Sequence, residues 1–84
     1  MMKKYTPILK AIANSNRLKI LSLLNKEELN VGKLEKYLNL SQSALSQHLA
    51  VLRKANIVKT RRNAQTIYYR LENNIVRQIL NLLA

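Results

Sequence analysis

Cysteine is absent from this chain of 84 residues. Without thiols the chain can hold no disulfide framework, no thiolate metal site and no thiol redox switch. Aspartate is absent as well, no glycine-rich loop is present to hold a phosphate, and the single histidine cannot supply a metal site by itself. The acidic residues are four glutamates at scattered, surface-like positions. We therefore expect a protein that is not an enzyme and that uses no metal or cofactor.

Glycine and proline occur once each, and 48% of the residues are hydrophobic, which argues against a disordered or loop-rich chain. No apolar run reaches the roughly 18 residues needed to cross a bilayer. The start, MMKKYTPILK, lacks the apolar segment and cleavage site of a signal peptide. The prediction is a cytoplasmic protein without a membrane anchor. We expect residues 1–84 to form one small, mostly helical domain, whose size favours extra burial through self-association.

Acidic charge is scarce, since 15 lysines and arginines against four acids give a net charge of +11. The imbalance is greatest between Glu35 and Glu72, where no acidic residue occurs. A surface of one sign attracts polyanions, nucleic acid above all. The same charge would also suit an anionic membrane surface, or a protein that is merely basic and soluble. The cations in this interval are Lys36, Arg53, Lys54, Lys59, Arg61, Arg62 and Arg70.

Helical spacing of apolar residues predicts four helices before residue 56. The second, RLKILSLLN, presents a broad apolar surface and is expected to lie in the middle of the core. The third and fourth are short and separated by a tight turn at LNLS, which is typical of a helix-turn-helix. Each helix has a residue suited to cap its first N–H groups. These caps are Thr6 followed by Pro7, an asparagine among residues 14–16, Asn30 and Ser41.

The fourth helix is expected to divide into two faces, with Leu45, Leu49 and Leu52 on the buried one. Its exposed face offers neutral hydrogen-bonding groups first and cations afterwards. In a major groove the first could read base edges and the second could hold phosphates. An ordinary solvated face is the alternative. The exposed residues are Ser43, Ser46, Gln47, Ala50, Arg53 and Lys54, with Gln42 at the edge.

A period of two replaces the helical spacing after Asn56 and predicts two β-rich arms, IVKTRR and TIYYRL. Arg61, Arg62 and Gln65 lie at or near the tip of this hairpin, which would act as a basic wing beside the fourth helix. A two-residue turn centred on Asn63 and Ala64 would need positive φ at both positions, which Asn63 tolerates but which costs Ala64 about 1 kcal/mol. We therefore expect a longer or looser tip and a mobile wing.

The chain closes with a predicted helix, capped by Asn73 or Asn74, whose apolar stripe exceeds what docking on one small core requires. The helix could still pack wholly within its own subunit. Alternatively it pairs with the first helix and with its copy in a two-fold dimer. The residues expected at that interface are Ile8, Ile12, Val76, Ile79, Leu80 and Leu83.

At NSNRLKILSLL, LSQSALSQHLAVLRKANIVKTRR and TIYYRL the chain resembles the ArsR-type winged-helix repressors, within them the metal-independent branch related to biofilm and haemolysin regulators. The likeness extends from Ile8 to Leu83. It agrees with a mainly α winged helix-turn-helix of about five helices and a two-stranded hairpin, in the order α-α-α-α-β-β-α. It implies a homodimeric repressor that binds an inverted-repeat operator in double-stranded DNA and releases it when an inducer arrives.

The resemblance also assigns residues by position. Its base-contacting positions fall on Gln42, Ser43, Ser46 and Gln47, and its wing positions on Arg61, Arg62 and Gln65. Ser41, Arg53, Lys54 and His48 join the set expected at the DNA backbone. For His48, three roles stay open: a structural or phosphate-facing one, a base contact, and pH sensing.

The departures from the family concern its sensors. Metal-sensing members carry a cysteine-rich motif where this chain has ELNVGKL, or carboxylate and histidine ligands on the last helix, where it has NNIVRQILNLLA. Redox-sensing members pair a cysteine near Ser22 with one in the last helix. None of these residues is present, so an unknown small molecule or protein is left as the possible inducer.

A function of a different class is the alternative. The domain could be a basic protein-interaction or dimerisation module that recruits an acidic partner without operator-specific DNA binding. RNA is a third possible partner, which the lack of an aromatic stacking platform disfavours.

Overall fold

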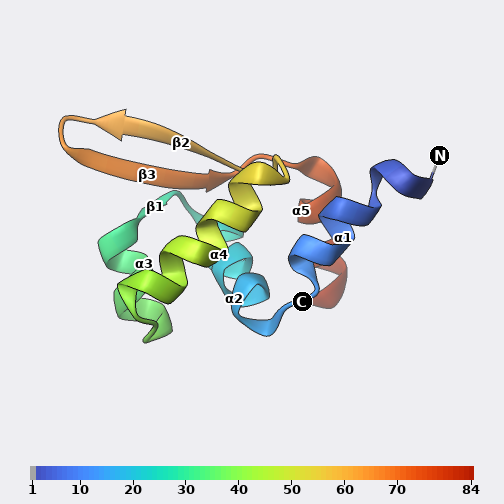
Figure 1. The fold of residues 1–84 in the computed structure, drawn as a ribbon, viewed down its shortest axis with the longest axis horizontal. Helices are drawn as coiled ribbons and strands as arrows, with labels where there is room; N and C mark the ends of the chain where they lie inside the picture. The colour runs from blue at the N-terminus through green and yellow to red at the C-terminus, as the bar shows by residue number, and fades with distance from the viewer. Residues whose placement is uncertain (1) are drawn as a thin grey trace.

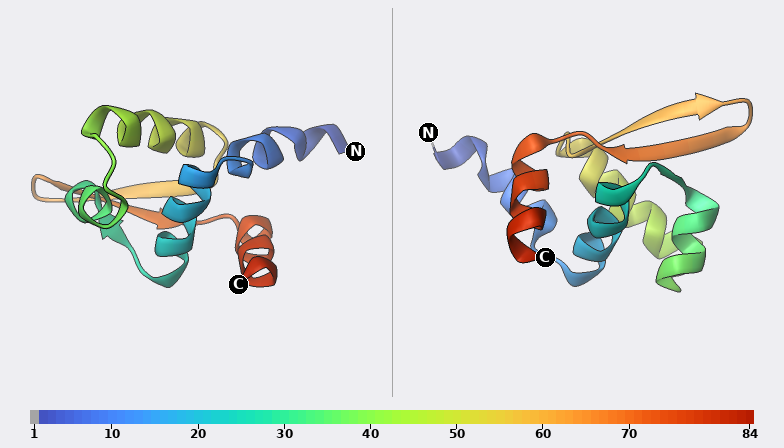
Figure 2. Two further views of the ribbon diagram at one scale, coloured as in Figure 1. Left: turned by 90° about the horizontal axis from the view of Figure 1, so that it is seen from below. Right: turned by 180° about the vertical axis from the view of Figure 1, so that it is seen from behind.

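The computed structural model describes residues 2–84, and Met1 lies outside them. Within this range the chain forms five α-helices, a short 3₁₀ helix and a small antiparallel sheet (Figure 1). The molecule measures 40 × 24 × 22 Å, with the hairpin projecting at one end and α1 at the other (Figure 2). The elements are η1 (Met2–Lys4), α1 (Thr6–Ile12), α2 (Ser15–Lys26), β1 (Leu29–Asn30), α3 (Val31–Leu38), α4 (Gln42–Lys54), β2 (Val58–Asn63), β3 (Thr66–Leu71) and α5 (Asn74–Leu83).

Side-chain caps begin four of the helices, in agreement with the sequence. Asn14, Asn30, Ser41 and Asn73 each accept a hydrogen bond from the backbone N–H three residues further on, over 2.8 to 3.1 Å. The cap predicted at Thr6 is wrong. The backbone is already helical at Tyr5, with φ −93° and ψ −15°, so Thr6 falls inside the first turn of α1.

The sheet contains a strand that the sequence pattern did not predict. Its strand order is β1-β3-β2, so β3 lies between the hairpin partner β2 and the two-residue strand β1. Leu29 pairs with Tyr69 and Asn30 with Tyr68. A strand of two residues is too short to show an alternating pattern, and only its distant partner makes it visible. The expected two-stranded hairpin is therefore part of a three-stranded sheet.

The tip of the hairpin is tighter than expected. Asn63 pairs with Thr66, so Ala64 and Gln65 alone form the turn. Of these two, only Ala64 has a positive φ, 57°, as in a type II′ turn. The prediction of a longer tip is wrong because one alanine in the left-handed region costs only about 1 kcal/mol, which pairing along the whole hairpin offsets. The mobility of the wing stays a prediction.

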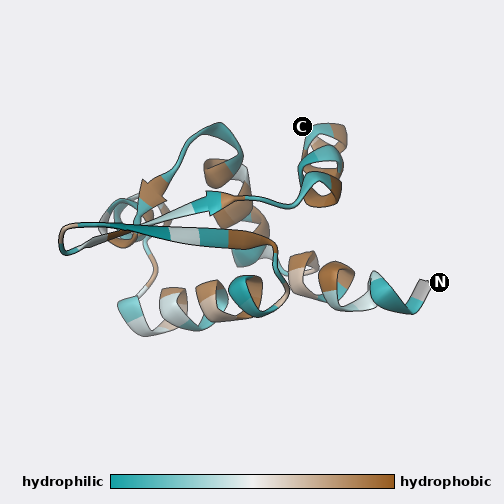
Figure 3. Cartoon of the chain, turned by 90° about the horizontal axis from the view of Figure 1, so that it is seen from above, coloured by the Kyte–Doolittle hydropathy of each residue, from teal (hydrophilic) through white to brown (hydrophobic). Residues whose placement is uncertain are grey.

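The core forms around α2, which contacts α1, α3, α4, α5 and β3. The face of α4 that carries Leu45, Leu49 and Leu52 is at most 2% exposed. Figure 3 shows hydrophilic colour along much of the hairpin, in contrast to the hydrophobic faces of the helices. At the far end of α2, Arg77 of α5 donates to the Asn25 side chain at 2.8 Å and to the Leu71 carbonyl at 3.0 Å. The last helix is thus fixed to the core by polar as well as apolar contacts.

Candidate nucleic-acid interface

The exposed face of α4 is the centre of the candidate interface. The predicted division of this helix into a buried leucine face and an exposed polar face is confirmed. Since the leucines hold the helix by one side, the opposite side chains are free to enter a groove of duplex DNA. The side chains exposed on α4 are Gln42, Ser43, Ser46, Gln47, Ala50, Val51, Arg53 and Lys54.

The turn before α4 fixes the direction of the helix. Helix α3 ends at Leu38 and is capped by Asn39, which takes the left-handed conformation with φ 55° and whose N–H donates to the Glu35 carbonyl at 3.0 Å. Two residues later the Ser41 hydroxyl accepts from the Ala44 N–H at 3.1 Å and starts α4. This short connection makes α3 and α4 a helix-turn-helix, and it places the serine and glutamine end of α4 beside the turn.

Arg61 of the wing is engaged within the molecule. Its Nε and Nη2 atoms each lie 2.7 Å from the Glu28 Oε1 atom, and its guanidinium carbon lies 4.5 Å from the centre of the Tyr68 ring. Glu28 precedes β1, so the ion pair connects the hairpin to the rest of the domain. Arg61 is therefore suited to positioning the wing more than to meeting a phosphate.

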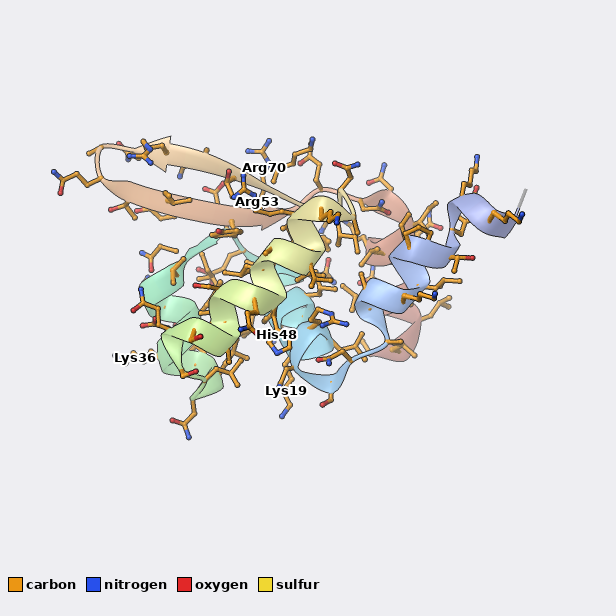
Figure 4. The ribbon with its side chains drawn as sticks, in the orientation of Figure 1. Lys19, Lys36, His48, Arg53 and Arg70 are labelled. Atoms are coloured by element: carbon orange, nitrogen blue, oxygen red, sulfur yellow. The ribbon has the colours of Figure 1, made fainter. Side chains whose placement is uncertain are left out.

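A second ion pair lies at the base of the hairpin, where Arg70 Nε donates to Glu72 Oε2 at 2.9 Å. This hydrogen bond and the charge of Arg70 lower the pKa of the Glu72 carboxyl, and the same contact raises the pKa of the Arg70 guanidinium. Within residues 2–84 only Arg61 and Arg70 form ion pairs with glutamates. In the same residues no glutamate lies within ion-pairing distance of Arg53, Lys54, Lys59 or Arg62. Arg53 and Arg70 are labelled in Figure 4.

A polar groove of about 480 Å³ lies between α4 and the wing. Gln42 and Ser46 form one side of it, Gln65 and Thr66 the other, and the start of α3 closes the end. Sequence reasoning assigned Asn30 only as a helix cap and did not assign Gly32 or Thr66 to the interface. The pairing of β1 with β3 brings these three residues to the groove. The one sequence signal that could have indicated this was the position of Asn30 directly before the helix-turn-helix.

Comparison with known proteins places this geometry in a family. The family model described as bacterial regulatory protein, arsR family, matches residues 14–60. The chain belongs to the ArsR family. It is 51% identical over 80 residues to the transcriptional activator HlyU of Vibrio cholerae, covering 95% of this chain and 74% of HlyU. It is 55% identical over 76 residues to the nodulation protein NolR of Rhizobium meliloti, covering 90% of this chain and 62% of NolR.

The solved structures agree with the sequence relationship. HlyU from Vibrio cholerae superimposes with a TM-score of 0.92 over 96% of this chain and 88% of that chain, at 51% identity. The repressor BigR from Xylella fastidiosa gives 0.90 over 96% and 83%, at 38% identity. The predicted fold class, a winged helix-turn-helix, is confirmed. This ArsR-family chain is a transcriptional regulator, in which α4 is the recognition helix and β2 with β3 the wing.

His48 lies at the edge of the recognition helix and is half-buried. Its ring points toward α2 (Figure 4), where its Nδ1 atom lies 3.3 Å from Nη1 of Arg17. The Nε atom of Arg17 donates to the Ala11 carbonyl, so His48 takes part in the contact of α4 with α1 and α2. Of the three roles considered for His48, its position favours the structural one.

The residues assigned to a dimer interface differ in accessibility. Ile12, Val76 and Leu80 are 7%, 0% and 6% exposed and belong to the core of their own subunit, so they offer a partner little surface. Ile8 and Ile79 are half-buried, and Leu83 is 67% exposed. A helical stripe cannot distinguish a chain's own core from a partner, because both bury apolar residues. The exposed apolar side chains on α1 and α5 are Leu9, Ile75, Leu82 and Leu83.

Metal ligands do not cluster in the described part of the chain. Within residues 2–84 no three histidine, cysteine, aspartate or glutamate side chains gather as a metal would require. Over the same residues no helix combines the length and the apolar character needed to span a membrane.

Proposed function

We propose that the protein is a cytoplasmic, homodimeric repressor that binds an inverted-repeat operator in double-stranded DNA. The observation that carries the proposal is the exposed face of α4, with neutral polar side chains at its start and uncompensated cations at its end. Neutral donors and acceptors at the amino end of a recognition helix can read base edges, and cations behind them can hold phosphates. The relatives include the transcriptional activator HlyU and biofilm growth-associated repressors. Our choice of a repressor follows the resemblance to the ArsR-type repressors.

The roles are divided by position. We assign base reading to Gln42, Ser43, Ser46 and Gln47. Phosphate contacts are assigned to Ser41, Arg53, Lys54, Arg62 and Gln65. Arg61 holds the wing through Glu28, and His48 holds α4 against Arg17.

The dimer is proposed to form through α1 and α5. These helices lie at the end of the molecule opposite to the wing tip (Figures 1 and 2) and expose Leu9, Ile75, Leu82 and Leu83. A two-fold axis through this surface would present two recognition helices to successive major grooves, which matches an inverted repeat. The chain carries none of the familiar metal or thiol sensor residues, so any inducer acts on other groups.

Selection of bound duplexes from a random pool tests the proposal directly. A two-fold symmetric consensus is expected, together with binding of random duplex DNA with a dissociation constant of roughly 1–100 μM at about physiological salt. Absence of both would favour the basic protein-interaction module. Screening metals against the selected site completes the test, since release by stoichiometric zinc would contradict metal independence.

The Gln47→Ala variant is expected to relax sequence preference. Removing a bidentate base contact costs about 1–3 kcal/mol of discrimination at one base pair and leaves non-specific binding nearly unchanged. Competition between the selected operator and single-base variants measures this loss. Gln78→Ala, an exposed glutamine of α5, is the matched control. Unchanged discrimination in Gln47→Ala would remove this residue from the base-reading set.

The Arg62→Ala variant is expected to weaken binding to all sequences alike. Loss of one phosphate contact reduces the slope of log affinity against log salt by about one unit. Affinities for operator and random duplex over a range of salt concentrations measure the slope. Arg70→Ala removes the same charge from a residue already paired with Glu72, so its slope should stay close to that of the parent. If both variants reduced the salt slope by the same amount, the reduction would come from the lower net charge and not from a phosphate contact of Arg62.

A further inference from the structure

A second groove borders the DNA-facing surface at Lys54 and lies between α1 and the carboxyl half of α4. Its volume is about 380 Å³, which is within the range of small-ligand sites. The floor is apolar and is made by Pro7 and Ala11 from α1, by Val51 from α4 and by Ala55 directly after it. Val51 is 39% exposed, so this floor is accessible in the subunit.

Three cations from three helices surround the apolar floor: Lys10, Arg17 and Lys54. None of them forms an ion pair with a glutamate within residues 2–84. All the glutamates lie on other parts of the chain, from Glu27 at the end of α2 to Glu72 after β3. An apolar floor under uncompensated positive charge is complementary to an anion that carries an apolar body.

Arg17 is already held in place at this groove. Its Nε donates to the Ala11 carbonyl, its Nη2 donates to the Lys10 carbonyl at 3.5 Å, and its Nη1 faces His48. A guanidinium has five N–H donors, so some remain for a ligand. Because the side chain is fixed before binding, an anion would lose little affinity to ordering it.

We propose that this groove binds a small organic anion with an apolar body, of the class of medium-chain carboxylates. The alkyl part would lie over Val51 and Ala55, and the carboxylate would meet Lys10, Arg17 and Lys54 at the rim. A nucleic-acid phosphate lacks the apolar part that the floor requires, and an amphiphilic cation would be repelled by the rim.

Binding at this groove would affect the regulator through Lys54, which stands both at the rim and on the exposed face of α4. An occupied groove neutralises a cation that the proposed function assigns to DNA. This consequence rests on the proposed function, whereas binding of the anion does not.

Calorimetric titration of the full chain tests the ligand class, with decanoate as the probe below its micelle concentration. Acetate supplies the charge without the chain, and decyltrimethylammonium supplies the chain with the opposite charge. Decanoate is expected to bind one site per subunit, at least about tenfold more tightly than either control. Equal binding of decanoate and the cationic amphiphile would overturn the proposal, as would absence of decanoate binding.

Substitutions locate the site. Val51→Trp fills the groove and is expected to weaken decanoate binding by at least about tenfold. Lys10→Gln removes one rim charge and should weaken it by about two- to fivefold. Lys33→Gln, on α3 and outside this groove, is the matched control and should have no effect. Wild-type affinity in both groove variants, with circular dichroism showing that they are folded, would place the anion elsewhere and overturn the proposal. Titrating duplex DNA without decanoate tests the DNA-binding proposal alone, so the two can fail separately.

Discussion

The double substitution Leu82→Glu and Leu83→Glu is expected to split the dimer and to remove most operator affinity. These side chains are 84% and 67% exposed, so the core of the subunit, which uses Val76 and Leu80 of the same helix, stays intact. At the proposed interface the change would bury four unpaired carboxylates per dimer, which association cannot compensate.

Loss of the dimer is expected to weaken DNA binding because it lowers the effective concentration of the second subunit at the operator. When one half-site is bound, the partner subunit of a dimer meets the second half-site at a high local concentration, which raises affinity by about 10²- to 10⁴-fold. A monomer loses this gain. Analytical ultracentrifugation would report the oligomeric state, and gel-shift titration would report operator affinity. A variant that remains dimeric would place the interface elsewhere, and a monomer with full operator affinity would refute the requirement for a dimer.

Tyr37→Glu is a control for this experiment. It also replaces a large exposed side chain by a carboxylate, at 60% exposure, but on α3. Its oligomeric state should match that of the unmodified chain.

The Leu45→Ala substitution is expected to cost a large share of the folding stability. Leu45 is fully buried, and truncating a buried leucine costs about 2–5 kcal/mol. A small domain has only about 5–10 kcal/mol in total, so a large part of the population would lose its fold under mild denaturant. Because Leu45 holds the first turns of the recognition helix, DNA binding should fall with the folded fraction.

Urea denaturation followed by circular dichroism measures this loss. Ser43→Ala on the exposed face of the same helix is the control, with an expected change within about 0.5 kcal/mol. A loss below about 1 kcal/mol for Leu45→Ala would mean that the leucine face is not what anchors α4.

Local chemistry made much of the helical structure predictable. Asn30 and Ser41 start their helices through side chains that meet N–H groups three residues away, and such short-range contacts are legible in sequence. The two faces of α4 follow from helical period alone. The cap predicted at Thr6 from the same short-range rule was wrong, because the backbone is already helical at Tyr5 and no local pattern indicated this.

Contacts between distant residues were not predictable in this way. Strand β1 exists because Leu29 meets Tyr69, and Arg61 is paired because Glu28 lies across the fold from it, 33 residues away in sequence. For the same reason the sequence identified the exposed face of α4 but not the groove that Asn30 and Thr66 complete. It also could not separate Val76, which is buried in its own subunit, from Leu83, which is exposed.

The ion pair between Arg61 and Glu28 affects how salt titrations of this protein should be understood. Its side chains are 46% and 25% exposed, so added salt screens it while also competing for phosphates. As this ion pair weakens, the wing loses its fixed position, and Arg62 and Gln65 move away from the phosphates that they are proposed to contact. The salt slope then contains a conformational contribution as well as released counterions, and a phosphate count taken from it would be too high.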